Sequence, residues 1–421
     1  MSSRIREAGR TTAHHPSQPH TGSPLPYVAL FAAGALPAYL APGIVGRLTG
    51  DLRLTPTQAG AVGSAMLLAS ALAGIALAGR VGRLGAARLA RAGLVLELAG
   101  FTVAGTMAGH PAAADGPPLV LLLGCLLGGL GAGTCAAVAG TGIAAGDRHR
   151  TTVLALLTTS GTAGALYLLL PHLGRGHALP FLALALAAAL AFPLLLRLPG
   201  PPPGAVPGPV PAAAAGHGVG LALAACMVLW SVAQNALWGV SGQLGLHRAG
   251  LSESRLCLVL AVALGSALLG VLAAGLLGDR AGPVLPVALG TGAIAACVVL
   301  SATATSAPAF AVGEVLWNAL YPLVLSYLIG AAAALDPSGR WTVLTGAASA
   351  LGVAGGPLTG AALLAGLGAP RFAAVLGTAL LATAVPLGLV ARTAARRSGA
   401  APGGAPLVPT QRAGSPTAAT A

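Results

Sequence analysis

The chain has 421 residues, of which 56% are hydrophobic and only 7% are Asp, Glu, Lys or Arg. Because soluble domains average about 25% charged residues, this composition excludes a soluble globular protein. The formal net charge of +13 comes entirely from arginine, since the sequence has no lysine. The arginines lie singly or in small groups between apolar runs, which is typical of membrane proteins, so no nucleic-acid partner is expected.

Twelve apolar runs follow one another along the chain, each long enough to cross a hydrocarbon core of roughly 30 Å as a helix. Lipid offers no partners to backbone N–H and C=O groups, so helices rather than open strands are expected. The expected helices span residues 26–46, 57–79, 88–109, 118–145, 151–172, 178–198, 218–244, 252–278, 284–305, 308–334, 341–366 and 370–391. The sequence therefore predicts an all-α membrane protein with twelve transmembrane helices in the lipid bilayer.

A proline-rich stretch, residues 199–217, follows the sixth run and divides the chain into two parts of similar length. Proline prevents a helix from continuing and favours an extended linker. We therefore expect an N-terminal six-helix bundle over 26–198 and a C-terminal six-helix bundle over 218–392. The polar ends, 1–25 and 393–421, are expected to be disordered cytoplasmic tails.

The two halves repeat one another. Thr55, ahead of the second run, corresponds to Ser252 ahead of the eighth, and Arg83 after the second run corresponds to Arg280 after the eighth. Both pairs share one offset, which indicates an internal duplication. The two bundles should therefore be related by pseudo-twofold symmetry.

The placement of arginine predicts the orientation. The two tails and the loops on their side of the membrane together hold more arginines than the opposite loops. Cytoplasmic loops are the ones enriched in arginine. Both termini are therefore expected to be cytoplasmic, in a protein of the plasma membrane.

The loop after the eighth run contains Gly275, Asp279, Arg280 and Gly282. With this loop in this position, the chain resembles the major facilitator superfamily of transporters across nearly all of residues 26–392. That family has two six-helix bundles around a central cavity, and a glycine–aspartate–arginine loop after the second helix with a degenerate copy after the eighth. The resemblance implies that the loop acts as a cytoplasmic latch in gating.

The first copy of this loop departs from the family pattern. It keeps Arg83 and Gly85, but Gly82 stands where the family has an aspartate. The gating role of the first copy is therefore in doubt.

A second family pattern lies in the eleventh run, at Gly352, Gly356, Pro357 and Gly360. Small residues let helices approach closely, and proline introduces a kink. In antiporters of the family this pattern lies in the fifth helix, which here lacks the proline. Cys125 also stands where drug/proton antiporters have a fourth-helix arginine, so the resemblance favours the family more than standard drug/proton antiport.

Glu314 in the tenth run is the first candidate for a proton site. Trp317, Asn318 and Tyr321 follow it at i+3, i+4 and i+7, on one face of a helix. Ionisable groups inside a membrane are costly, and burial disfavours the charged form of a carboxyl group until water reaches it. The alternative is a protonated glutamate that is hydrogen-bonded within the bundle and has no transport role.

Glu97 in the third run is the second proton-coupling candidate. It follows Arg91 by about 9 Å of helical rise, so it could also reach back toward the cytoplasmic surface. In the family the third helix is peripheral, which makes Glu97 the weaker candidate.

The seventh run offers a face for solute binding. Trp230, Gln234 and Trp238 lie at i, i+4 and i+8, beside Asn235, and the first run adds Tyr39. Indoles and amides suit an aromatic or moderately polar organic solute held by stacking and a few hydrogen bonds. The alternative is interfacial anchoring by tryptophan, with amide bonds between helices.

No nucleotide-binding loop, zinc motif or nucleophile elbow is present, so we expect neither an enzyme nor ATP hydrolysis, and no cofactor or metal. The five cysteines lie in apolar runs as small hydrophobic residues. The leading hypothesis is a monomeric, proton-linked secondary transporter of a small organic solute, with export ahead of uptake. The alternatives are an importer of a neutral metabolite and a transport-inactive sensor or scaffold.

Overall fold

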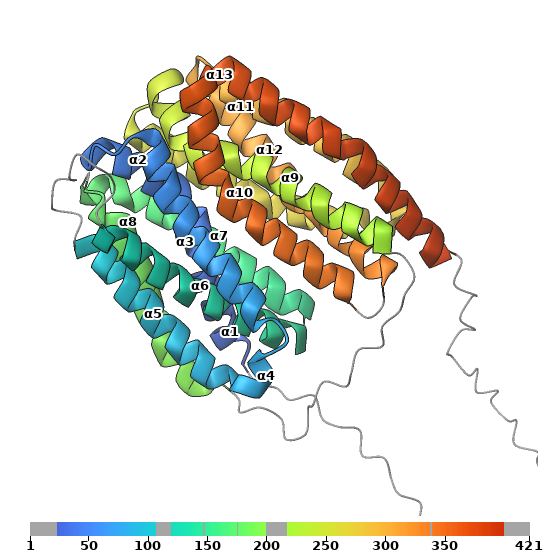
Figure 1. The fold of residues 1–421 in the computed structure, drawn as a ribbon, viewed down its shortest axis with the longest axis horizontal. Coiled ribbons are helices and arrows are strands. Elements are labelled where there is room, and N and C mark those ends of the chain that lie inside the picture. Colours follow the sequence, from blue (N-terminus) through green and yellow to red (C-terminus); the bar gives the residue numbers. More distant parts are fainter. Residues whose placement is uncertain are drawn as a thin grey trace, which may run out of the picture.

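The computed structural model describes residues 23–106, 119–145, 148–174, 176–198, 217–336 and 339–399. Every regular element in these ranges is a helix (Figure 1). In chain order the elements are α1 (Leu25–Tyr39), α2 (Ala41–Asp51), α3 (Pro56–Leu77), α4 (Val81–Leu84), α5 (Ala86–Thr106), α6 (Leu119–Ala145), α7 (Arg148–Leu173), α8 (Ala178–Ala191), η2 (Phe192–Arg197), α9 (His217–Gln243), η3 (Leu244–Arg248), α10 (Glu253–Leu277), η4 (Gly278–Ala281), α11 (Val284–Thr303), α12 (Ala307–Leu335) and α13 (Arg340–Gly399). Most of the expected tails and of the linker lies outside the described residues.

Ten of these helices are long and apolar enough to cross a membrane, or eleven if the bent pair α1–α2 forms one span. Large apolar side chains are exposed along them, including Leu119, Leu276 and Val385. Such surfaces are stable against lipid but not against water. The prediction of an all-α, multi-pass membrane protein is confirmed.

The first expected helix, 26–46, is broken in the structure. α1 ends at Tyr39, α2 begins at Ala41, and the two are bent by 45°. Pro42 has no N–H for the carbonyl of Ala38, four residues earlier, and its ring crowds that carbonyl, so the helix cannot continue straight. The break leaves the Ala38 carbonyl without its usual helical partner.

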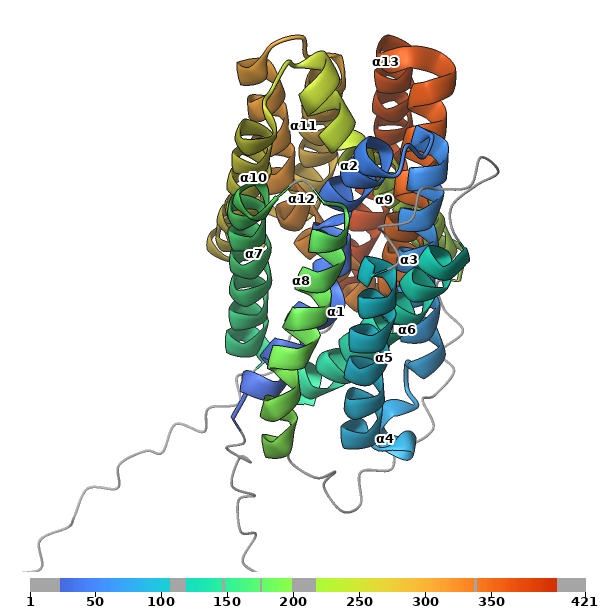
Figure 2. The ribbon, with the colours of Figure 1, turned by 90° about the vertical axis from the view of Figure 1, so that its left-hand side faces the viewer.

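The last two expected helices form one element, α13, of 60 residues. Gly368 interrupts it with φ 73° and ψ 163°, a conformation that glycine adopts at little cost. In Figures 1 and 2 the orange and red legs of α13 run back from this turn. The second leg continues to Gly399, beyond the expected end at 391.

The repeated residues Thr55 and Ser252 each cap the N-terminus of a helix. The Thr55 hydroxyl accepts from the backbone N–H of Gln58 at 3.2 Å, and the Gln58 side chain accepts from the Thr55 N–H at 2.9 Å, which completes a capping box. The Ser252 hydroxyl accepts from the N–H of Arg255 at 3.4 Å. The repeat in the sequence therefore marks the N-termini of α3 and α10.

Helices α1–α8 gather on one side of the molecule and α9–α13 on the other (Figure 1). The groups meet where α3 packs on α13, α7 on α10 and α2 on α9; Figure 2 shows α7 beside α10. At Gly60 of α3 an added Cβ would stand 2.6 Å from the Pro357 carbonyl of α13. This interface is therefore close-packed backbone to backbone.

Candidate functional site

Glu314 is completely buried in α12 and is surrounded by hydrogen-bonding side chains from three helices. Its Oε1 lies 2.8 Å from the hydroxyl of Ser241 in α9 and 2.6 Å from that of Ser301 in α11. Its Oε2 accepts from the indole Nε1–H of Trp317 at 3.1 Å. The short serine distances are typical of hydrogen bonds to a carboxyl group.

Ser241 gives this arrangement two alternative hydrogen-bond patterns. Its hydroxyl has a single proton but two neighbours that can accept it, the Leu237 carbonyl at 3.0 Å and Glu314 Oε1. When Glu314 is ionised, Ser241 donates to the carboxylate. When Glu314 is protonated, its own O–H donates to Ser241, which turns its proton to Leu237. The site can thus satisfy either protonation state by rotating one hydroxyl.

An aromatic cluster adjoins Glu314. It consists of Trp230 and Trp238 of α9 and Trp317 and Tyr321 of α12. Trp230 stacks on Tyr321 with ring centroids 5.2 Å apart, and Trp317 meets both Trp238 and Tyr321 edge to face, at 5.9 and 6.3 Å. The structure therefore brings together the two helix faces singled out from the sequence.

Two polar atoms in or next to this cluster have no hydrogen-bond partner among the described residues. They are the indole Nε1 of Trp230 and the amide Oε1 of Gln234, and both side chains are fully buried. The other amides bond to their own helices: Asn235 Nδ2 donates to the Ser231 carbonyl and Asn318 Nδ2 to the Glu314 carbonyl, each at 2.9 Å. A buried polar atom without a partner is costly, so these two atoms call for a functional explanation.

The broken first span contributes backbone carbonyls to the same region. The freed Ala38 carbonyl accepts from Trp238 Nε1–H at 3.0 Å, and the Tyr39 carbonyl accepts from the Tyr167 hydroxyl at 3.0 Å. Tyr39 itself is half-buried against the core. The kink at Pro42 thus joins α1 to α9, across the two groups of helices.

An ionic contact joins the two groups of helices, α1–α8 and α9–α13, at the end of the molecule where α2 lies, called here the α2 end. The sequence did not predict this contact. Arg47 of α2 pairs with Glu253 at the start of α10 at 2.9 Å. The same guanidinium donates to the carbonyls of Gly176 at 2.9 Å and Leu170 at 3.2 Å. The only signal in the sequence was that both charges lie at the ends of apolar runs.

Glu97 does not reach back toward the membrane surface. It is fully buried between α5 and α6, and neither carboxyl oxygen has a hydrogen-bond partner in the described part of the chain. Its neighbour is the Cys135 thiol of α6. Close packing of α5 on α6 explains the burial. One turn before Glu97, an added Cβ at Gly93 would stand 2.9 Å from the Cys135 sulfur of α6.

Glycines with positive φ lie in both expected gating loops: Gly85 (φ 90°) ends α4, Gly278 (φ 46°) ends α10, and Gly282 (φ 58°) follows η4. Arg83 and Arg280 are both exposed, and Arg280 donates to the Leu276 carbonyl at 3.3 Å. Gly275 is also exposed, and the side chain of Asp279 lies outside what the structure describes. The expected part of Asp279 in the cytoplasmic latch therefore stays a prediction.

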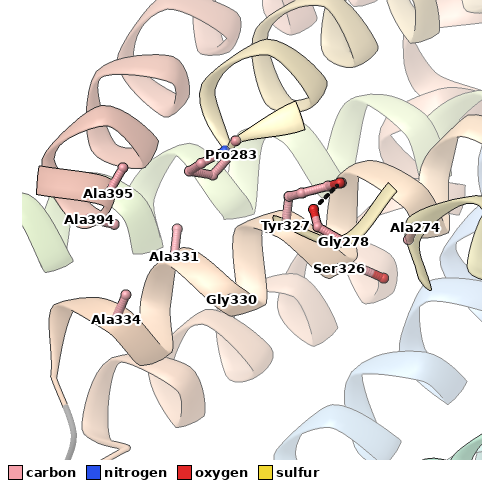
Figure 3. Close-up of a pocket in the computed structure, with 11 residues that line it drawn as sticks. Ala274, Gly278, Pro283, Ser326, Tyr327, Gly330, Ala331, Ala334, Ala394 and Ala395 are labelled. Atoms are coloured by element: carbon pink, nitrogen blue, oxygen red, sulfur yellow. Dashed lines mark hydrogen bonds between the residues drawn. The ribbon is translucent and has the colours of Figure 1, made fainter. Parts of the chain in front are cut away.

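A cavity of about 440 Å³ lies beside the second loop. Small residues line it, among them Gly278, Gly330, Ala331 and Ala394, and Tyr327 donates to the Gly278 carbonyl at 2.9 Å across one side (Figure 3). The cavity lies apart from the aromatic cluster and holds no carboxyl group among its lining residues.

The glycine–proline pattern of α13 lies against α9. An added Cβ at Gly352 would stand 2.5 Å from Ser231, and one at Gly356 would stand 2.5 Å from Asn235. Gly360 lies as closely against Ala236, and Pro357 packs on Gly239. The pattern therefore lets α13 pack directly against α9, the helix that carries Trp230, Trp238 and the amides of Gln234 and Asn235.

Within the described ranges, no group of three His, Cys, Asp or Glu side chains could hold a metal ion. All five cysteines are free thiols.

Solved transporters share this fold. A POT family transporter in complex with 5-aminolevulinic acid matches with a TM-score of 0.70 and 13% identity, over 88% of this chain and 96% of the other. A D-xylose–proton symporter matches with a TM-score of 0.64 and 15% identity, over 86% and 95%. The human organic anion transporter MFSD10 (TETRAN) matches with a TM-score of 0.63 and 16% identity, over 86% and 98%.

No protein-family model matches the sequence, and no curated protein sequence matches it. The similar structures named here are all transporters and none is an enzyme. The membrane-spanning helices, with these likenesses over most of the chain, show that the protein has the fold of the major facilitator superfamily of transporters.

Proposed function

We propose that this protein is a secondary transporter that moves a small organic solute by alternating access, with the Glu314 carboxyl as its proton site. The observation that carries the proposal is the surroundings of Glu314: a buried carboxyl whose hydroxyl and indole neighbours can satisfy both protonation states. The adjoining aromatic cluster and its two unpartnered polar atoms provide the solute site. A site that exchanges protons must be stable in both states, and a merely structural glutamate needs only one.

We propose export as the direction. The hydrogen bonds of Glu314 come from two serines and a tryptophan, with no basic side chain among them. A carboxylated nutrient would need an arginine or lysine at its site. The site therefore suits solutes without an acidic group, which favours export over the uptake of a carboxylated nutrient.

Twelve spans in two six-helix bundles, over 26–198 and 218–392, complete the proposal. Counting α1–α2 as one span and dividing α13 at Gly368 gives twelve. The matching caps at Thr55 and Ser252 support a pseudo-twofold relation between the bundles.

Reporter fusions after residue 215 and at the C-terminus are both expected to report a cytoplasmic location. An even number of spans separates these points from one another and from the N-terminus in the 6+6 arrangement. Reporters on opposite sides of the membrane would contradict that arrangement.

Alternating access requires the α2 end to open. In the proposed orientation this end faces outward, and Arg47–Glu253 together with Trp238–Ala38 close it. The two expected gating loops, at Arg83 and Arg280, then lie on the cytoplasmic side. Opening on one side and closing on the other exposes Glu314 to each side in turn.

Asp279→Asn is expected to slow transport and to leave the equilibrium affinity for solute within about threefold, because a latch acts on the conformational change rather than on the solute. Transport rate and binding are measured on the same reconstituted sample. Arg255→Gln, which removes an exposed charge at the opposite end of α10, serves as the control. A large loss of affinity with normal turnover would show that the loop belongs to the solute site.

The proposed function is tested in liposomes that contain the purified protein. Labelled neutral, cationic and anionic organic solutes are supplied while a pH gradient is imposed. We expect at least one solute to accumulate beyond the level in protein-free liposomes, and a protonophore to remove this accumulation. Equal distribution of every solute, with and without protein, would favour the sensor or scaffold hypothesis.

A further inference from the structure

A histidine lies beside the Arg47–Glu253 pair at the α2 end. His177 directly precedes α8, and its Nδ1 lies 3.5 Å from the Oδ2 of Asp51, the last residue of α2. The imidazole is 11% exposed, and both of its ring nitrogens are buried without a hydrogen-bond partner among the described residues. A proton on the ring turns the contact with Asp51 into an attraction between opposite charges. Protonation therefore changes the interaction between α2 and the start of α8.

The charged groups around this imidazole lie on α2 and at the end of α7. α2 contributes Asp51 and Arg47, whose guanidinium donates to the carbonyl of the residue before His177. α1 and α8 contain no Asp, Glu, His, Lys or Arg. In the last turn of α7, His172 is exposed, and the side chain of Arg175 lies outside what the structure describes. Because imidazole is the side chain that ordinarily changes its charge between about pH 5 and 8, His177 is the buried group through which pH acts on this end.

Asp51 has two basic groups that can neutralise it. Arg47 and Asp51 are four residues apart in α2, at i and i+4, where side chains of one helix face meet. In the structure Arg47 instead reaches Glu253 of α10 at 2.9 Å, while Asp51 faces His177. A charged His177 satisfies Asp51 and leaves Arg47 to Glu253. Without that proton, the carboxylate of Asp51 attracts Arg47 and competes with Glu253.

We propose that His177 is a pH sensor of the α2 end, which holds this end closed when protonated and lets it open when neutral. The inference rests on the proposed function and adds a regulation to it. In the closed state Arg47 is bound to Glu253, so Asp51 is available to the imidazolium. By linkage, acid therefore favours the closed state and alkali the open one. In the proposed orientation this end faces outward, so acid outside slows its opening.

The test measures the ratio of closed to open molecules. Spin labels are attached at two exposed positions, as Thr57→Cys in α3 and Leu258→Cys in α10, in a chain whose five natural cysteines are alanine. All samples carry Glu314→Gln, which removes the proposed proton site and its own titration. The protein in nanodiscs is measured by double electron–electron resonance at about pH 5 and about pH 8. In this parent we expect the closed-to-open ratio to be roughly two- to fivefold higher at the lower pH, the effect of a partly exposed ion pair.

Two variants of the parent should shift the ratio in opposite directions. His177→Gln is neutral at every pH, so the ratio should stay at the parent's alkaline value. Asp51→Asn removes the competitor for Arg47, so the ratio should stay at or above the parent's acid value. His172→Gln, which changes an exposed histidine at the same end, is the control and should keep the pH dependence.

A ratio in the parent that does not depend on pH would overturn the proposal. So would a pH dependence that survives His177→Gln, or a shift of His177→Gln and Asp51→Asn in the same direction. None of these outcomes bears on proton-driven accumulation in liposomes, whose failure is the result that contradicts the proposed function.

Discussion

Glu314→Gln is expected to abolish proton-driven accumulation of solute in liposomes, while exchange of solute between equal compartments continues. The glutamine amide reproduces the protonated acid: its oxygen can accept from Trp317 and its N–H can donate to Ser241 and Ser301. The packing and the hydrogen bonds therefore survive, but no proton can leave. Net transport needs the proton to be released on each cycle, and exchange does not. Both activities are measured on one preparation.

Glu97→Gln is the matched control, because it neutralises an equally buried carboxyl that lies between α5 and α6, away from the aromatic cluster. Accumulation by this variant should equal that of the wild type. If Glu314→Gln still accumulates solute while Glu97→Gln does not, the proton site is Glu97. If both variants accumulate it, Glu314 has only a structural role.

Glu253→Gln is expected to shift the protein toward a state that is open at the α2 end. The variant removes the charge pair with Arg47 but keeps a side chain of the same shape. A partly buried pair worth about 1 kcal/mol changes the ratio of closed to open molecules by roughly fivefold. The expected result is faster reaction of Cys257 with a membrane-impermeant thiol reagent.

Cys257 is a suitable reporter because it is buried one turn after Glu253 in α10. The other four cysteines are replaced by alanine, so that only this thiol reacts. Arg255→Gln is the control, since Arg255 is exposed on the same turn of α10 and Glu253 and Arg47 are untouched. An unchanged rate in Glu253→Gln, or an equal increase in Arg255→Gln, would show that the Arg47–Glu253 pair does not hold this end closed.

Periodicity within one helix was enough to group the residues of the candidate site on α12. Glu314, Trp317 and Tyr321 are in contact in the structure, as their spacing of three and four predicts. Spacing also grouped Trp230 and Trp238 on α9. That these two faces meet is a property of tertiary packing, which spacing within one helix does not predict.

The partners of Glu314 from other helices could not be predicted. Ser241 and Ser301 reach its carboxyl only because α9 and α11 pack on α12 at one particular height, which no local pattern encodes. Arg47 and Glu253 are 206 residues apart in the chain, so no local pattern links them either. The break at Leu40 was not predicted, although Pro42 is its cause. Its consequence, a carbonyl free to bind Trp238, depends on where α9 lies.

The most direct test of proton-linked transport measures proton movement itself. Liposomes containing the wild-type protein and a trapped pH-sensitive dye receive an outward or inward gradient of one organic solute, with no pH gradient imposed and the membrane potential clamped. For at least one solute, proton movement across the membrane should follow the solute gradient, reverse when that gradient is reversed, and disappear in Glu314→Gln. A solute that crosses with the protein and leaves the internal pH equal to that of protein-free liposomes would contradict proton coupling.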